Sequence, residues 1–272
     1  LFRAAGSGRI DRVLVSIGAP WQSTSVRMEH FEQKTPFTFS RHLVSTALEK
    51  VAVAPPGRIL ADESVIGTLL NGYETHDPYG KQAFRASVII LTSFVDEKVA
   101  KSLSVILRGL YHAGDITCIA ASSLHYQALK IAFPHEHDAL ILDSSGPMTS
   151  VALVRGGLLV DVIEVAGKKT DIPEWQRTIL DECAHIAEKF PLPRTIFLIA
   201  SDSHLSVLKE ALDAKTLGAL WLSDNPPKVI PVLASYLDEF VRQATEPSSD
   251  TTLLLMALLH GARTSKDASN TQ

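Results

Sequence analysis

The sequence predicts an α/β protein with covered sheets, and two patterns support this prediction. Short apolar runs indicate buried strands, for example at residues 12–18, 139–143 and 195–199. Longer segments in which apolar residues recur at helical spacing lie between them, such as residues 95–110. Buried strands that alternate with helices are typical of α/β folds. A length of 272 residues, with 46% hydrophobic and 21% charged residues, fits a globular chain of this kind.

The first half of the chain is expected to form strands and two helices after a flexible end at residues 1–9. The further strands are predicted at residues 23–29, 59–66 and 84–92, the last of them strongly β-branched. A helix of about ten residues should end near Glu49, and the helix at 95–110 should be capped by Ser93. Residues 70–81 form a turn-rich connection.

In the second half, residues 139–163 contain strand-like runs separated by tight turns. The first run ends at Asp143, the second spans residues 151–154, and the third follows Gly156 and Gly157, which can take the positive φ angles of a hairpin turn. The other strands are predicted at residues 116–120 and 195–199. Helices are predicted at residues 122–132, 172–188, 205–212, 229–241 and 253–259, with a polar loop at 245–250 and a polar tail at 264–272.

Charge and composition exclude several classes of protein. A net charge of -4 and a pI near 6.2 give no electrostatic reason to expect binding to nucleic acid or to an anionic membrane. No apolar run approaches the roughly 20 residues of a membrane span. Cys118 and Cys183 have no metal-type spacing, so free thiols in a reducing compartment are expected.

The turn after residue 143 has the residue types of a phosphate site. Asp143 ends a strand, a turn of small residues containing Gly146 follows, and Thr149 supplies a hydroxyl. Turns of this kind bind nucleotide phosphates because their amides point at the anion, while a carboxylate holds the metal. Pro147 removes one amide donor, and Met148 places an apolar chain where a hydroxyl would be useful.

This stretch resembles the phosphate-2 hairpin of the actin-like ATPase superfamily, Asp-Ile-Gly-Gly-Gly-Thr-Thr-Asp. Asp143, Gly146 and Thr149 match that pattern. The residues that depart from it are Ser144, Ser145, Pro147, Met148 and Ser150. The resemblance therefore implies that the hairpin is kept and that its phosphate chemistry is degenerate.

Further stretches resemble, in the same order, the cell-division actin homologue FtsA and its pilus-assembly relative PilM. The Asp77-Pro-Tyr-Gly80 turn before a long strand is similar to a turn of their inserted SHS2 (1C) subdomain, and residues 165–172 are similar to Gly-Asn-x-x-Thr-x-Asp-Ile. The resemblance implies an actin-like, ribonuclease H-like ATPase fold. It assigns residues 1–23 and 108–135 to a partial subdomain 1A, 24–107 to the SHS2-like insertion, 136–263 to subdomain 2A and 264–272 to a polar tail.

The chain also departs from that family. No phosphate-1 hairpin is present, and the adenosine motif, usually Leu-x-Gly-Gly-Gly, corresponds to residues 198–205, which contain Ala200 and Ser201 but no glycine. Residues 170–195 are long enough for one helix, so subdomain 2B is predicted to be absent. The polar tail differs from the membrane-targeting helix that ends FtsA. Candidate nucleotide-binding residues are Asp143, Gly146, Thr149, Ala200 and Ser201.

Other residue clusters have structural explanations. His135-Glu136-His137 indicates a solvated loop, because no third metal ligand is suggested. Asp202-Ser203-His204 contains triad residue types, but helix capping by Asp202 or Ser203 explains them better. The pair His76-Asp77 precedes a proline, and an Asp-Pro sequence is typical of turns. The alternative is that this pair contacts a protein partner. Trp175 and Trp221 are expected in the core.

The resemblance implies a cytoplasmic scaffold of cell division or type IV pilus assembly, with weak or no nucleotide binding and with no catalytic or metal site. Its partners would be proteins of the division or pilus machinery that bind the SHS2-like insertion and recruit the chain to the inner membrane face, with self-association as a further expectation. One alternative is an active ATPase that binds ATP with magnesium and polymerises. The other is a small-molecule kinase of the same superfamily.

Overall fold

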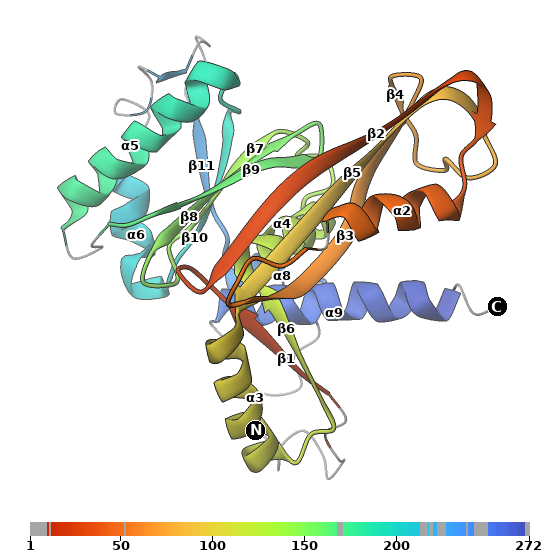
Figure 1. The fold of residues 1–272 in the computed structure, drawn as a ribbon. Coiled ribbons are helices and arrows are strands. Elements are labelled where there is room, and N and C mark those ends of the chain that lie inside the picture. Colours follow the sequence, from red (N-terminus) through yellow and green to blue (C-terminus); the bar gives the residue numbers. More distant parts are fainter. Residues whose placement is uncertain are drawn as a thin grey trace.

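The structure is a computed structural model, and it describes residues 10, 12–51, 53–167, 171–212, 217, 220, 221, 227–237, 239–241 and 250–269. The described strands form three sheets (Figure 1). A two-stranded parallel sheet pairs β1 (Arg12–Ile17) with β6 (Asp115–Ala120). The predicted flexible end at residues 1–9 lies outside the described residues.

The four-stranded antiparallel sheet has the order β2-β5-β3-β4 and is built from long strands. They are β2 (Gln22–Thr38), β3 (Arg58–Leu70), β4 (Tyr73–Glu74) and β5 (Gln82–Asp96). The positions of the predicted strands are confirmed, but the predicted ranges are too short. Pairing with distant strands extends the observed strands beyond their apolar centres. Helix α2 (Arg41–Val51) packs Ala47 and Val51 with Val88 and Ile90 of β5.

Helix α3 (Glu97–Tyr111) follows β5 directly and projects from the body of the molecule (Figure 1). Its N-cap is Asp96, whose side chain accepts a hydrogen bond from the amide of Val99 at 3.0 Å. The predicted cap at Ser93 is wrong. Ser93 lies inside β5 and its hydroxyl is bonded to that of Thr24 at 2.9 Å, because the strand continues past the last apolar residues of the sequence pattern.

The five-stranded sheet has the order β11-β10-β7-β8-β9 and contains the predicted meander, which is confirmed. Its strands are β7 (Ala139–Asp143), β8 (Thr149–Arg155), β9 (Leu158–Val165), β10 (Thr195–Ile199) and β11 (Lys228–Pro231). Helices α5 (Ile172–Lys189) and α6 (Asp202–Ala211) pack on one face around Leu140 and Leu142. Helix α4 (Ala121–Ala132) and α9 (Thr251–Ser269) pack on the other face, against Ile141.

The C-terminal quarter differs from the predictions. The expected helix at residues 229–241 is wrong, since Val229 and Ile230 lie in β11, which pairs in parallel with β10, and among the described residues of this range only α8 (Ala234–Leu237) is helical. A short apolar run fits a buried strand as well as a helix, and pairing with β10 decides between them. The expected helix at 253–259 lies in the first half of α9, and the helix continues to Ser269 through most of the predicted tail. Residues 245–249 and 270–272 lie outside the described part.

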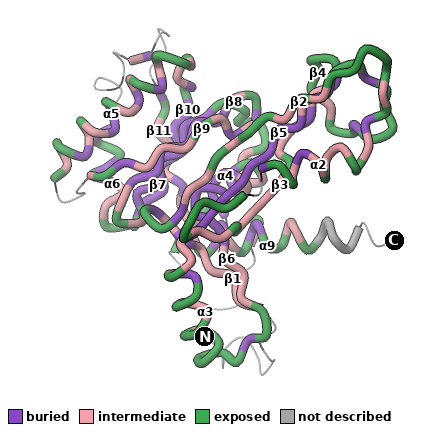
Figure 2. Tube along the Cα trace, viewed as in Figure 1, coloured by how far each residue is buried: buried purple, intermediate pink, exposed green. Residues whose placement is uncertain are grey.

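Burial differs between the sheets (Figure 2). Strands β7 and β10 are buried at every residue, whereas most residues of β1 and β6 are of intermediate exposure. Cys118 and Cys183 are free cysteines, as predicted, and burial raises the pKa of Cys183 to about 12, with Glu182 adding to the shift. Among the helices of the described residues, none has the length and apolar character needed to span a membrane.

Helix α4 connects the parts of the fold through polar side chains. Asp62 of β3 accepts hydrogen bonds from Ser123 and Gln127 of α4, each at 2.7 Å, and lies 3.2 Å from Arg263 of α9. Between these two residues in the sequence, Tyr126 donates to the carbonyl oxygen of Gly157 in the β8–β9 turn at 2.9 Å, and Gln127 accepts a hydrogen bond from Arg263 at 3.0 Å. The four-stranded sheet, the hairpin and the C-terminal helix are therefore all bonded to one helix.

Candidate functional site

The predicted phosphate site corresponds to the turn that follows β7. Asp143 is the last residue of β7, which pairs in parallel with β10, and the amide of Ser144 donates to the carbonyl oxygen of Ile199 at 2.7 Å. The carboxyl ends of two neighbouring parallel strands therefore meet here. In open α/β sheets ligands bind at such strand ends.

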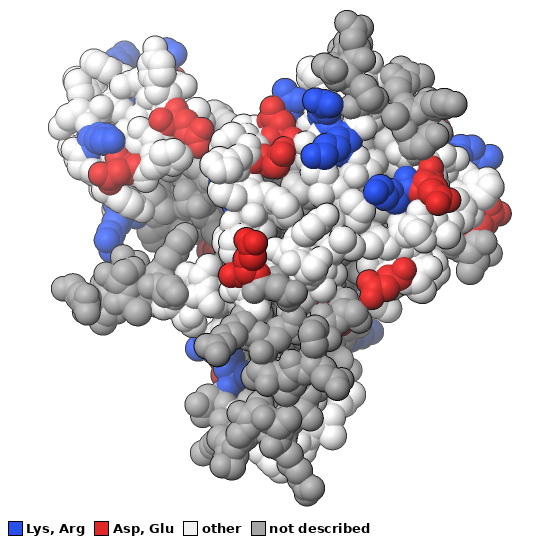
Figure 3. Space-filling view, turned by 180° about the vertical axis from the view of Figure 1, so that it is seen from behind, with Lys and Arg blue, Asp and Glu red and all other residues white. Residues whose placement is uncertain are grey.

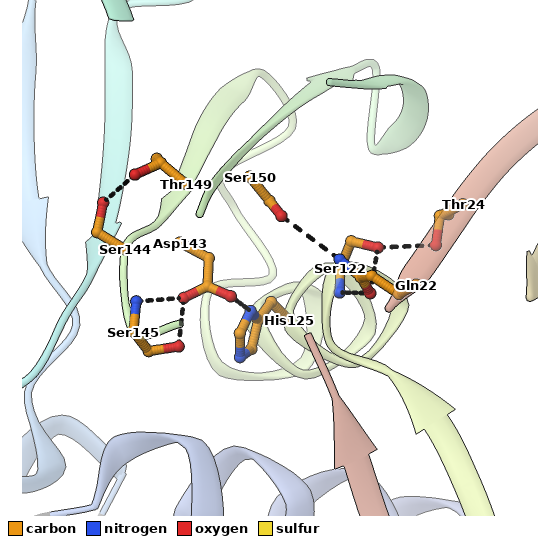
Figure 4. A network of polar contacts seen from close by, with 9 residues as sticks. All are labelled: Gln22, Thr24, Ser122, His125, Asp143, Ser144, Ser145, Thr149 and Ser150. Carbon is orange, nitrogen blue, oxygen red and sulfur yellow. Dashed lines mark hydrogen bonds and ion pairs between the residues drawn. The ribbon is translucent and has the colours of Figure 1, made fainter. Parts of the chain in front are cut away.

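The Asp143 carboxylate is buried and already bonded within the chain (Figure 4). Its Oδ1 accepts hydrogen bonds from the amide and the hydroxyl of Ser145, at 2.9 and 2.6 Å. Its Oδ2 lies 3.3 Å from Nδ1 of His125 on α4, at ion-pair distance. Burial acts to raise the pKa of Asp143, but His125 and the two bonds from Ser145 outweigh it and hold the pKa below its usual value.

Acid should remove the stabilisation that Asp143 provides. Because its folded-state pKa lies below the unfolded value, the contribution is complete above about pH 4 and is lost as the pH falls through the lower folded pKa. We expect the difference in unfolding free energy between wild type and Asp143→Asn to be constant from pH 7 to 5 and to shrink below pH 4. Urea denaturation across this range measures it, and a difference that grows in acid would contradict the assigned shift.

Thr149 is also enclosed. It is 0% exposed, and its Oγ1 accepts a hydrogen bond from the indole Nε1 of Trp175 on α5 at 2.9 Å. The same oxygen lies 3.0 Å from the hydroxyl of Ser144. The hydroxyl that the family pattern would offer to a nucleotide is therefore used inside the core.

Gly146 faces another turn of the protein. A Cβ built on Gly146 would lie 3.7 Å from the carbonyl oxygen of Ala19, in the turn between β1 and β2. Three residues further along, Gln22 at the start of β2 bonds Ser122 of α4 at 3.1 Å and Ser150 of β8 at 3.4 Å (Figure 4). The chain thus covers its own phosphate-like turn.

Ala200 and Ser201 line a pocket of about 480 Å³ together with Ser145. Its polar lining consists of hydroxyls and of the carboxylates of Asp202 and Asp250, at the starts of α6 and α9. The described lining residues include no Lys or Arg. The negative charge of these two carboxylates opposes the binding of a polyphosphate unless a metal ion accompanies it.

The predicted site residues therefore fall into two layers. Ala200 and Ser201 line an open pocket, whereas Asp143 and Thr149 lie beneath it and Ser145 is the link between them. Whether these residues bind nucleotide stays a prediction. Sequence reasoning missed His125, and the available signal was a pair of serines and a histidine at the start of an otherwise apolar helix.

The other candidate clusters are structural in the described residues. Glu136 accepts a hydrogen bond from Thr195 at 2.9 Å, and no three His, Cys, Asp or Glu side chains of the described residues gather into a group that could hold a metal. Capping of α6 by Asp202 or Ser203 is wrong. The N-cap residue is Ser201, whose hydroxyl lies 2.9 Å from Nδ1 of His204 and makes no capping bond.

Comparisons with known proteins bear on the fold. The sequence matches no protein-family model and no curated protein. Among solved structures, the chain is similar to a PilM-PilN type IV pilus biogenesis complex at 15% identity and a TM-score of 0.55, over 94% of this chain and 81% of that one. It is also similar to a Bacteroides thetaiotaomicron protein with an actin-like ATPase fold and unknown function, at 10% identity and a TM-score of 0.40, over 92% and 73% of the two chains.

The first likeness spans nearly the whole chain and confirms the predicted fold class, a mixed α/β protein with the actin-like ATPase fold. At 15% identity it shows the fold alone. The domain boundaries drawn from the sequence, the SHS2-like insertion and the FtsA-type division role stay predictions.

Proposed function

We propose that the chain is a protein-binding scaffold of the FtsA/PilM kind that acts in type IV pilus assembly or cell division, with weak or no nucleotide binding. One observation carries the proposal: the carboxylate of Asp143 and the hydroxyl of Thr149, which should hold a magnesium nucleotide, are both bonded to the protein's own side chains. The similar chain whose structure was solved was part of a PilM-PilN complex, which supports a protein partner in the pilus machinery.

The partner surface that we propose is a groove of about 610 Å³ beside α3. Its walls come from the start of β3, in the predicted SHS2-like insertion, from α3 and from β6. Its apolar lining residues are Ile59, Leu60, Ala61, Ala100, Val105 and Ile116. Val105 is 72% exposed and Leu60 is 39% exposed, so both present apolar area that a partner could cover.

The charges of this groove indicate the chemistry of its partner. Lys101 and Arg108 line it, and the described lining residues include no carboxylate. An apolar protein segment that carries acidic residues would therefore fit it best. Among the described residues on the face shown in Figure 3, positive and negative side chains are interspersed and form no extended basic area for a nucleic acid.

Site-specific photo-crosslinking in the source cell tests the proposed groove. We expect a photoreactive amino acid at Val105 to form an adduct with one protein of the pilus or division machinery, and Leu60→Glu to abolish that adduct because it places a charge in the apolar wall. The matched control is the same amino acid at Val207, an exposed valine of α6 that is 44% exposed. The same adducts from both positions, or none from Val105, would contradict a partner in this groove.

A working ATPase is the second candidate function. It is supported by the pocket that Ser145 shares with Ala200 and Ser201, because residues from both degenerate motifs line one cavity. Binding there would have to break the Ser145–Asp143 hydrogen bonds to free the carboxylate for a metal ion. A working ATPase of this kind would be expected to assemble into polymers. A cytoplasmic location is expected for both the scaffold and the ATPase.

A further inference from the structure

A second groove, of about 380 Å³, lies between the two-stranded sheet and α9. Its volume falls in the range of small-molecule sites. Strand β1 runs toward the point where α9 begins, so the two elements diverge from the centre of the molecule (Figure 1). The start of β1 and the later part of α9 therefore lie farther from the centre of the molecule than the end of β1 and the start of α9.

The inner part of this groove is apolar. Leu14 of β1 and Ile119 of β6 line one wall, and Leu253 and Met256 of α9 line the other. Leu253 is 54% exposed although it belongs to a helix whose opposite side lies in the core. Ile119 is 1% exposed and Leu14 and Met256 pack against the core, so the apolar area that the groove offers comes from Leu253 and from the uncovered parts of Leu14 and Met256.

The outer part of the groove is polar and cationic. Along α9 the lining changes from Leu253 and Met256 to His260 and Arg263, and Arg12 lies at the start of β1. Asp115 holds the Nε of Arg12 at 2.9 Å, and Asp62 holds the Nη2 of Arg263 at 3.2 Å. Asp115 accepts from the Nε of Arg12, Asp62 and Gln127 accept from the Nη2 of Arg263, and neither aspartate is among the described lining residues.

We infer that this groove binds a free long-chain fatty carboxylate. The acyl chain lies along Leu14, Leu253 and Met256, and the carboxylate meets the guanidinium groups of Arg12 and Arg263. The change from apolar to cationic lining carries this assignment, because a guanidinium is the planar donor that fits a carboxylate. A cationic head group would meet like charges, and an uncharged one would lose the charge-assisted bonds. The groove shares Thr117 with the proposed protein-binding groove, but its other lining residues differ, and the inference does not depend on that proposal.

Calorimetric titration with dodecanoate tests the inference on the whole chain. We expect saturable binding of one molecule, and decanoate to bind up to about fifteenfold more weakly, because each buried methylene contributes roughly fourfold. Dodecylamine should not bind at this site. Ala257→Trp, which fills the groove from an exposed position, and His260→Glu, which adds a negative charge at its mouth, should each weaken dodecanoate binding at least tenfold.

The control is Ser102→Glu, which adds the same charge on the exposed side of α3, outside the groove, and should leave binding unchanged. Three results would overturn the inference: no saturable binding of dodecanoate, equal binding of dodecylamine, or binding that survives both Ala257→Trp and His260→Glu. Because all three variants change exposed residues, circular dichroism and thermal melting can establish that each is folded before it is titrated.

Discussion

Replacing His125 with leucine is expected to destabilise the protein by about 3–5 kcal/mol, because it removes the imidazole that faces the buried carboxylate of Asp143 and leaves that charge less compensated. His125 is 1% exposed and Asp143 is 6% exposed, so the carboxylate left behind could not reach water without opening the fold. Ser145 would remain as its donor, but no imidazole nitrogen would face it from α4. Urea denaturation at pH 7 measures the loss.

A double mutant separates this effect from a simple loss of packing. Asp143→Asn removes the charge, so His125→Leu should be less damaging when it is added to that background than when it is added to wild type. If the two losses are additive, or if His125→Leu alone costs less than about 1 kcal/mol, the side chains do not form the coupled pair described here.

Trp175→Ala should have an effect of similar size, about 3–5 kcal/mol, because it removes the largest fully buried side chain of the described residues, which packs from α5 against the five-stranded sheet. The indole also donates to Thr149, so the substitution would leave that buried hydroxyl with Ser144 as its remaining partner. Thermal and urea denaturation of the same variant check the prediction.

Trp175→Phe is the matched control, since it keeps most of the ring and removes the donor. We expect a smaller loss, about 1–2 kcal/mol, from the missing hydrogen bond and the reduced volume. Equal losses in the two variants would mean that the contact with Thr149, and not the packing of the ring, dominates at this position.

The sequence alone predicted the strands at the centre of the fold and the turn at Asp143. Both depend on local patterns: an apolar run such as residues 139–143, or two glycines between strands, is visible within a few residues. The same local pattern could not distinguish β11 from a helix, because pairing with β10 lies outside the run itself. It also could not show that β2 continues to Thr38, since those residues are held by β5.

The contacts that define the candidate site were beyond sequence reasoning for the same reason. His125 and Asp143 come from a helix and a strand that the fold brings together, and Asp62 meets Arg263 from the far end of the chain. A degenerate phosphate motif indicated weakened nucleotide chemistry, but only the structure supplies a physical basis for it. The groups that remain from the motif are bonded to partners of their own.

Calorimetric titration of magnesium-ATP into the folded protein tests this account most directly, with Asp143→Ala as the control. Because the Asp143 carboxylate is already bonded within the chain, we expect no detectable heat of binding from wild type or from the variant. Micromolar binding by the wild type that is lost in Asp143→Ala would contradict it. That result would show that the bonds from His125 and Ser145 yield to a nucleotide, and it would favour the ATPase over the scaffold.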